Sequence, residues 1–147
     1  MLRSITVSVA AFCTFFITPV SASYNRPVDV REVVSTSWDL VEVSAQMQAT
    51  AMALGDFEVA RAAKDLHREA LDWYAALREI GSDAKSVAPH ELPAARDEMV
   101  QAYDDLAGHM DAVDVTGSPE LRTLWRMTQN RMRSAKRAVG QTQFEDI

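Results

Sequence analysis

The sequence predicts an all-α fold: an up-down-up-down antiparallel four-helix bundle that follows an N-terminal signal peptide. Apolar residues recur at alternating steps of three and four over several long segments, which is the spacing of one buried helix face. Glycine and proline are nearly absent from these segments and gather between them, where helices end and loops turn. Because the connections are short, consecutive helices are expected to be antiparallel neighbours.

The first 22 residues are expected to be a secretory signal peptide. They begin with a short positively charged start, Met1-Leu2-Arg3, continue with mostly apolar residues over 5–17, and end in Val20-Ser21-Ala22. A positive start, an apolar centre and a small-x-small site predict cleavage after Ala22. The alternative is a retained membrane anchor, although the apolar run is shorter than the roughly 20 residues needed to span a bilayer.

Removal of residues 1–22 takes away Arg3 and the only cysteine, Cys13, so the net charge changes from −6 to −7. A chain without thiols forms no disulfide and no thiolate metal site, and its stability depends on a hydrophobic core. About 125 residues suffice, because a chain of this size buries about two-thirds of its unfolded surface. Together with the signal peptide, these features predict a periplasmic or secreted protein.

The first two helices are bounded by proline and glycine. The first is predicted near 27–54, between Pro27 and Gly55, and its apolar residues cover a wide face. The second is predicted near 56–80 and is ended by Gly81; its apolar residues form one narrow stripe with charges between them. A stripe of this kind predicts a helix with one buried side and one solvated side.

The last two helices have clear start signals. The third is predicted near 93–115, with Pro93 in its first turn, and the fourth near 119–139. Ser118 precedes the fourth helix as a capping residue, and Gly140 follows it. Both helices carry apolar residues at helical spacing, so each is expected to bury one face in the bundle.

The predicted domain spans 23–139. Its longest connection, 82–92, is expected to be the mobile element, and 140–147 is expected to be a flexible tail. No segment alternates with period two, so no strand is predicted. Trp38 and Trp73 fall at one level of the first two helices and are interpreted as a packed aromatic pair.

The third and fourth predicted helices carry opposite charge. Six acids against Arg96 give the third a net charge of −5, and six bases against Glu120 give the fourth +5. Three of the acids are spaced seven apart on one helix face: Asp97, Asp104 and Asp111. The simplest interpretation is that these charges specify which helices pair; the alternative is a basic surface on the fourth helix that binds nucleic acid or lipid headgroups. An overall acidic exported chain is not expected to bind nucleic acid.

The sequence lacks the residue patterns of several reaction centres. It has no Cys-x-x-Cys-His for covalent haem, no His-Glu-x-x-His, and no Gly-x-Ser-x-Gly elbow. A di-iron bundle needs Glu-x-x-His pairs, but Lys64 stands three residues before His67, and Leu106 three before His109. We therefore expect a protein that is not an enzyme.

Histidine and methionine are the remaining candidate ligands. Antiparallel pairing of the second and third helices places His67 within one turn of His109. Gly108, beside His109, costs roughly 1 kcal/mol relative to alanine in a helix, which suggests that another group approaches closely. The candidate mid-bundle metal ligands are His67, His109, Met47, Met110 and Met127. The alternative is that the histidines pack at helix flanks and the methionines fill the core.

The main functional hypothesis is a small exported helical bundle that binds another protein of the cell envelope without catalysis. The acids Asp97, Asp104 and Asp111, or the 82–92 connection, would form the binding surface. The alternative hypothesis is a bundle that binds copper or haem b through its histidines and methionines. The wide apolar face of the first helix also leaves room for a homo-oligomer. No stable membrane span is expected after cleavage.

Overall fold

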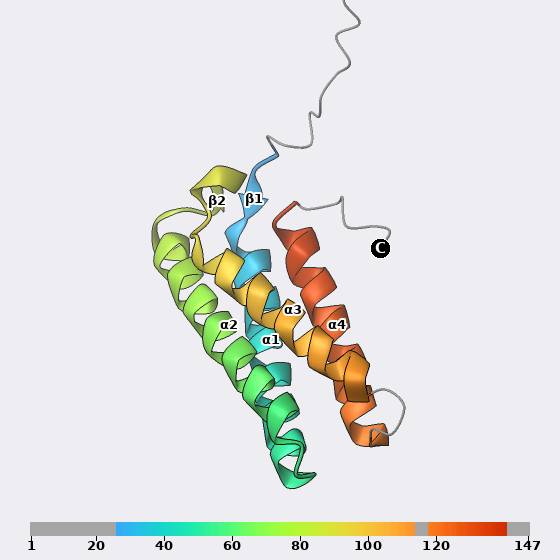
Figure 1. Cartoon of the computed structure of the whole chain (residues 1–147). Helices are drawn as coiled ribbons and strands as arrows, with labels where there is room; N and C mark the ends of the chain where they lie inside the picture. Colours follow the sequence, from blue (N-terminus) through green and yellow to red (C-terminus); the bar gives the residue numbers. More distant parts are fainter. Residues whose placement is uncertain (1–25, 114–117, 141–147) are drawn as a thin grey trace, which may run out of the picture.

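Four long α-helices dominate the computed structural model, which describes residues 26–113 and 118–140. The elements are β1 Val28–Asp29, α1 Val30–Ala53, α2 Phe57–Asp83, β2 Ser86–Val87, the 3₁₀ helix η2 Pro89–Glu91, α3 Ala95–Val113 and α4 Pro119–Ala138. The helices pack together, so the predicted all-α class is confirmed and the arrangement is consistent with a four-helix bundle. Figure 1 shows α1 and α3 running away from the end that holds the strands, and α2 and α4 returning to it. Within these residues, no helix is both long and apolar enough to cross a membrane.

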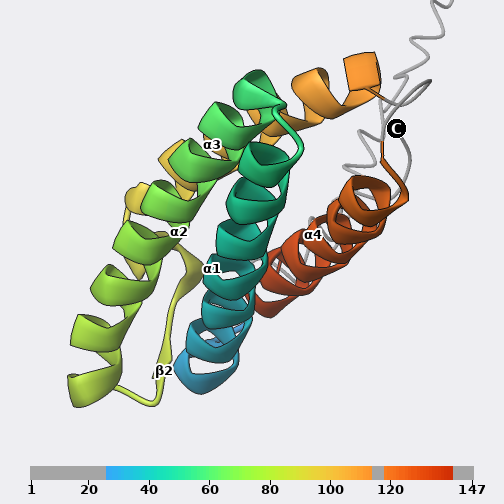
Figure 2. The ribbon, with the colours of Figure 1, turned by 90° about the horizontal axis from the view of Figure 1, so that it is seen from below.

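The helices are not all packed equally closely. α1 packs against α2 and α4, and α2 packs against α3; Figure 2 shows α1 between α2 and α4. α3 and α4 meet through large side chains. The ring of Tyr103 stacks on Trp125 with 5.4 Å between the ring centroids, and the Lys136 ammonium lies 5.7 Å from the Tyr103 centroid. We call this contact the α3–α4 seam.

Side-chain caps and glycines explain where the helices begin and end. Asp29 Oδ1 accepts a hydrogen bond from the Arg31 N–H at the start of α1, and Ser118 Oγ accepts one from the Leu121 N–H at the start of α4. Gly55 follows α1 with a φ of 76°, a left-handed conformation that glycine adopts without steric cost. These features confirm the predicted break at Gly55 and the predicted cap at Ser118.

Two predicted helix starts are two or three residues early. α1 begins at Val30 and not at Pro27, because residues 28 and 29 are extended and pair with β2. α3 begins at Ala95 and not at Pro93. The pairing with β2 is non-local, so helix periodicity gives no sign of it.

The predicted helix end at Gly81 is wrong, because α2 continues through this residue to Asp83. A Cβ at Gly81 would lie 3.2 Å from Val30 Cγ1, so this glycine allows α1 to approach α2 closely. The predicted close approach at Gly108 is also wrong, because a Cβ there would have no neighbour within 4 Å. The close contact therefore occurs at the glycine that was interpreted as a helix end.

Backbone hydrogen bonds hold the predicted mobile connection 82–92 to the start of α1. Its first two residues belong to α2, and β2 pairs antiparallel with β1, with Val28 opposite Val87. The Val30 N–H also donates to the Lys85 carbonyl at 3.1 Å. Each strand has only two residues, which is too short for an alternating pattern to be visible in the sequence.

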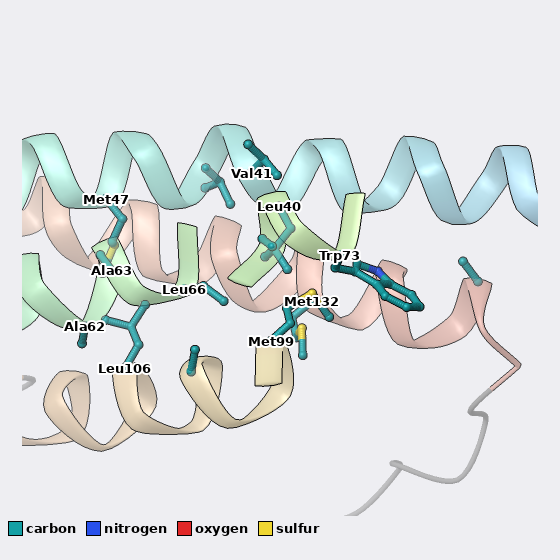
Figure 3. Close-up of a cluster of buried hydrophobic side chains, with 14 of the residues drawn as sticks. Leu40, Val41, Met47, Ala62, Ala63, Leu66, Trp73, Met99, Leu106 and Met132 are labelled. Carbon is teal, nitrogen blue, oxygen red and sulfur yellow. The ribbon is translucent and has the colours of Figure 1, made fainter. Parts of the chain in front are cut away.

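The core lies between the four helices and is filled by aliphatic, methionine and tryptophan side chains (Figure 3). Leu40, Leu66, Trp73 and Leu106 have no exposed surface. The predicted pairing of Trp73 with Trp38 is wrong: Trp38 is 42% exposed and packs on Tyr74 with 4.9 Å between ring centroids. Trp73 is fully buried in the core, so the two tryptophans have different surroundings.

Candidate binding site

His67 binds the backbone of α1 from the side of α2. Its Nδ1 lies 3.1 Å from the carbonyl oxygen of Val41 and 3.4 Å from the hydroxyl oxygen of Ser44. Since a carbonyl oxygen only accepts hydrogen bonds, the contact requires the proton on Nδ1. Ser44 is fully buried, and its hydroxyl also donates to the Val41 carbonyl. The half-buried imidazole therefore joins α2 to α1.

His109 occupies a different environment, on the exposed side of α3. It lines an open groove between α2 and α3 together with Gly108 and Asp105. The carboxylate of Asp105 accepts a hydrogen bond from the Gln101 amide at 3.1 Å. His67 is not among the residues that line this groove. The two histidines therefore have different surroundings.

The candidate methionine ligands are also separated by their environments. Met47 and Met110 are buried in the core, whereas Met127 is 39% exposed on α4. No group of three or more His, Cys, Asp or Glu side chains that could hold a metal ion occurs in the described parts of the chain. The copper or haem hypothesis therefore rests on the sequence spacing alone.

Three exposed acids on α3 form what we call the Asp row: Asp97, Asp104 and Asp111. The sequence interpretation assigned them to pairing with α4, and the observed ion pairs differ from it. Asp97 pairs with Arg96 on its own helix at 3.6 Å, and α4 reaches another helix through Arg131, which pairs with Asp39 of α1 at 3.2 Å. Within the residues that the structure describes, Asp104 and Asp111 make no ion pair.

The groove beside the Asp row is about 710 Å³ and is lined mainly by charged and polar residues. From α3 it receives Glu98, Asp104 and Asp105. From α2 it receives Arg68, whose charge is balanced by Asp65 at 3.4 Å and Glu69 at 2.7 Å. The hydrogen bond and the charge of Glu69 raise the pKa of Arg68. The α3 wall is acidic, and Arg61 on α2 is the one arginine of the groove without an ion pair in the described residues.

Exposed arginines on α4 form a second charged surface, which we call the Arg row: Arg122, Arg126, Arg133 and Arg137. They fall within about 60° of the helix circumference at 3.6 residues per turn. Arg133 makes no ion pair within the described residues, and its guanidinium donates a hydrogen bond to the Asn130 amide oxygen at 3.2 Å. Among those residues, the other three have no carboxylate within ion-pair distance. The sequence analysis counted these arginines but interpreted their charges as pairing α4 with the acids of α3.

The α3–α4 seam lies between the two rows. Tyr103 and Trp125 are both half-buried there, and burial is the largest cause that raises the pKa of Tyr103. The charge of Arg133 acts in the opposite direction, and that of Asp104 acts with burial. The pKa of this phenol therefore responds to one charge from each row, Arg133 and Asp104.

Comparison of the chain with protein-family models, curated proteins and solved structures finds no match.

Proposed function

We propose that this protein is exported, loses residues 1–22, and acts without catalysis as a binding module for another protein of the cell envelope. The Asp row of α3 is the proposed contact surface, and the partner presents a basic face to it. The observation that carries this proposal is the outward position of Asp104 and Asp111, whose side chains make no described ion pair with the rest of the bundle.

Burial and charge support a binding role for this surface. The exposed acids and the acidic wall of the groove lie side by side on α3, since Asp104 belongs to both. Charge concentrated on one face raises the rate of encounter with an oppositely charged partner and disfavours wrong partners. The groove also offers a concave surface into which a basic side chain of the partner would fit.

The sequence before the bundle supports export. The first described helix begins at Val30, so cleavage after Ala22 would leave all four helices intact. N-terminal sequencing of the exported protein is expected to begin at Ser23. A protein that still begins at Met1 after export would replace this part of the proposal with a membrane-tethered bundle.

Affinity capture from envelope extracts tests the proposed surface. The full chain is expressed with its N-terminal segment, recovered after export and used as bait, beside an Asp104→Asn/Asp111→Asn variant. We expect the variant to lose a basic protein that the parent captures, because it lacks two charges that face the partner. Asparagine keeps the size of the side chain, so the fold is expected to be unchanged.

A Glu32→Gln/Glu42→Gln variant serves as the matched control. Both glutamates are exposed on α1, and the change in net charge is the same. Equal loss of the partner in both variants would show that only net charge matters and would contradict an α3 surface. Failure of the parent to capture any protein reproducibly would contradict the proposed function itself.

A further inference from the structure

The Asp row and the Arg row match each other in length. From Asp97 to Asp111 is 14 residues, or about 21 Å of helix, and from Arg122 to Arg137 is 15 residues, or about 22 Å, at 1.5 Å per residue. The Asp row, with its spacing of seven, drifts by about 40° over its length, and the Arg row stays within about 60°, so each row stays on one face of its helix.

Both rows face the same side of the molecule. Asp104 directly follows Tyr103, and Arg126 directly follows Trp125; consecutive helical residues are rotated by about 100°. The rings of Tyr103 and Trp125 stack on each other across the seam, so each side chain extends from its own helix toward the other helix. Because α3 and α4 run in opposite directions (Figure 1), these two 100° steps have opposite senses when both helices are viewed from one end. Asp104 and Arg126 therefore lie on the same side of the seam. The buried residue Leu106 lies on the other side of α3.

The rows are also at the same height along the bundle. Tyr103 contacts both Trp125 and Lys136, which places it level with about residue 130. Both helices rise by about 1.5 Å per residue in opposite directions, so each step toward the end of α3 corresponds to one step toward the start of α4. Asp111 is then level with Arg122, and Asp97 is level with about residue 136, one residue before Arg137. The α3–α4 face therefore carries an acidic row and a basic row side by side, in register, with an aromatic seam between them.

We infer that a second copy of this chain docks on the α3–α4 face about a twofold axis parallel to the helices. Such an axis keeps each residue at its height and exchanges the two rows, so the Asp row of each copy faces the Arg row of the other. Asp111 of one copy then lies opposite Arg122 of the other, and both copies make the same contacts, as closed twofold symmetry requires.

The half-buried aromatic seam supports this arrangement. Protein interfaces combine an aromatic centre with a polar rim, and here Tyr103 and Trp125 form the centre while the charged rows form the rim. Exposed ion pairs are individually weak and are screened by salt. The net charge, −6 for the full chain and −7 after removal of residues 1–22, also repels a second copy at long range. The dimer is therefore reversible, and it depends on the rows meeting in register.

The inference rests on the proposed function in one respect: both treat the Asp row as a docking surface. In the absence of a basic envelope partner, the Arg row of a second copy covers the Asp row. The envelope partner and the second copy then compete for the same acids, so dimerisation keeps the binding surface covered until the partner is present.

Charge exchange between the rows tests the inference. One variant carries Asp104→Lys/Asp111→Lys, and the other carries Arg122→Glu/Arg126→Glu, both in the full chain recovered after export. Sedimentation equilibrium is measured for each variant, for the parent and for a mixture of the two variants. We expect the dissociation constant of each variant alone to rise at least about tenfold, because like charges then face each other.

The mixture gives the decisive result. A heterodimer of the two variants restores opposite charges at both contacts, so mixing is expected to recover the dimer that neither variant forms alone. The parent dimer is expected to dissociate in about 1 M NaCl, where the screening length is about 3 Å. Glu32→Lys/Glu42→Lys and Arg31→Glu/Lys64→Glu on α1 and α2 repeat the charge changes away from this face and are expected to leave the dimer intact.

Two outcomes would overturn the inference. The first is a parent protein that remains monomeric at low salt and high concentration, and the second is a dimer that persists in both row variants or is not recovered by mixing them. Circular dichroism of each variant shows whether it has kept its helices. If the parent is monomeric and still captures an envelope protein through Asp104 and Asp111, the second copy is excluded while the proposed function stands.

Discussion

His67 and His109 illustrate how the surroundings of a residue decide its role. Both lie near the edge of a helix stripe in the sequence, and both were candidate metal ligands. In the structure, His67 donates to the Val41 carbonyl across two helices, whereas His109 lies exposed in the α2–α3 groove. The same residue type therefore has a structural contact in one place and a solvated position in the other.

Alanine substitution is expected to separate the two histidines. His67→Ala removes a hydrogen bond between helices and should lower the free energy of unfolding by about 1 kcal/mol. His109→Ala, at an exposed position, should change it by less than about 0.5 kcal/mol. Urea unfolding followed by circular dichroism measures both values. Equal losses at the two positions would show that the His67 contact contributes no more to stability than the exposed His109 side chain does.

At the scale of the element, the two helical glycines differ in what surrounds them. Gly81 in α2 faces Val30 of α1, and Gly108 in α3 faces open space. Glycine lowers helix stability because its unfolded backbone has more conformations to lose. In α2, the lower helix stability is accompanied by closer packing, because the small residue lets α1 approach. In α3, the described contacts show no packing that requires a glycine at position 108.

Alanine at these glycines is expected to have unequal effects. Gly108→Ala should raise the free energy of unfolding by about 0.5–1 kcal/mol through helix propensity. Gly81→Ala should gain less or lose stability, because its Cβ would meet Val30 Cγ1 at 3.2 Å. Thermal or urea unfolding measures the difference. In a Val30→Ala background the penalty of Gly81→Ala should shrink, and an unchanged penalty would mean that Val30 is not its cause.

At the scale of the whole molecule, the bundle is held together by two kinds of contact. α1 packs closely on α2 and α4, and α2 on α3. The fourth side, between α3 and α4, is bridged by Tyr103 and Trp125. Because this side depends on a few large rings, the ionisation state of Tyr103 bears on how well the whole bundle closes.

The stability of the protein is expected to fall at high pH through Tyr103. Burial raises its pKa above the ordinary value of 10.0, so the folded state favours the neutral phenol. The contribution of this burial is complete below the unfolded pKa and is lost as the pH rises through the folded pKa. Urea unfolding at about pH 9 and about pH 11 should show a smaller loss for Tyr103→Phe than for the parent. An equal loss in both would mean that other groups cause it.

The sequence alone was enough to predict four helices and most of their ends. Helix periodicity, the cap at Ser118 and the glycine at Gly55 act within a few residues of each other, so they are visible without the fold. The tertiary structure decided which surface each helix turns to its neighbours. It placed His67 against α1 and His109 in a groove, paired Arg131 with α1, and set Gly81 against Val30. These outcomes depend on the rotation and height of each helix relative to the others, which are fixed by packing between residues far apart in the chain.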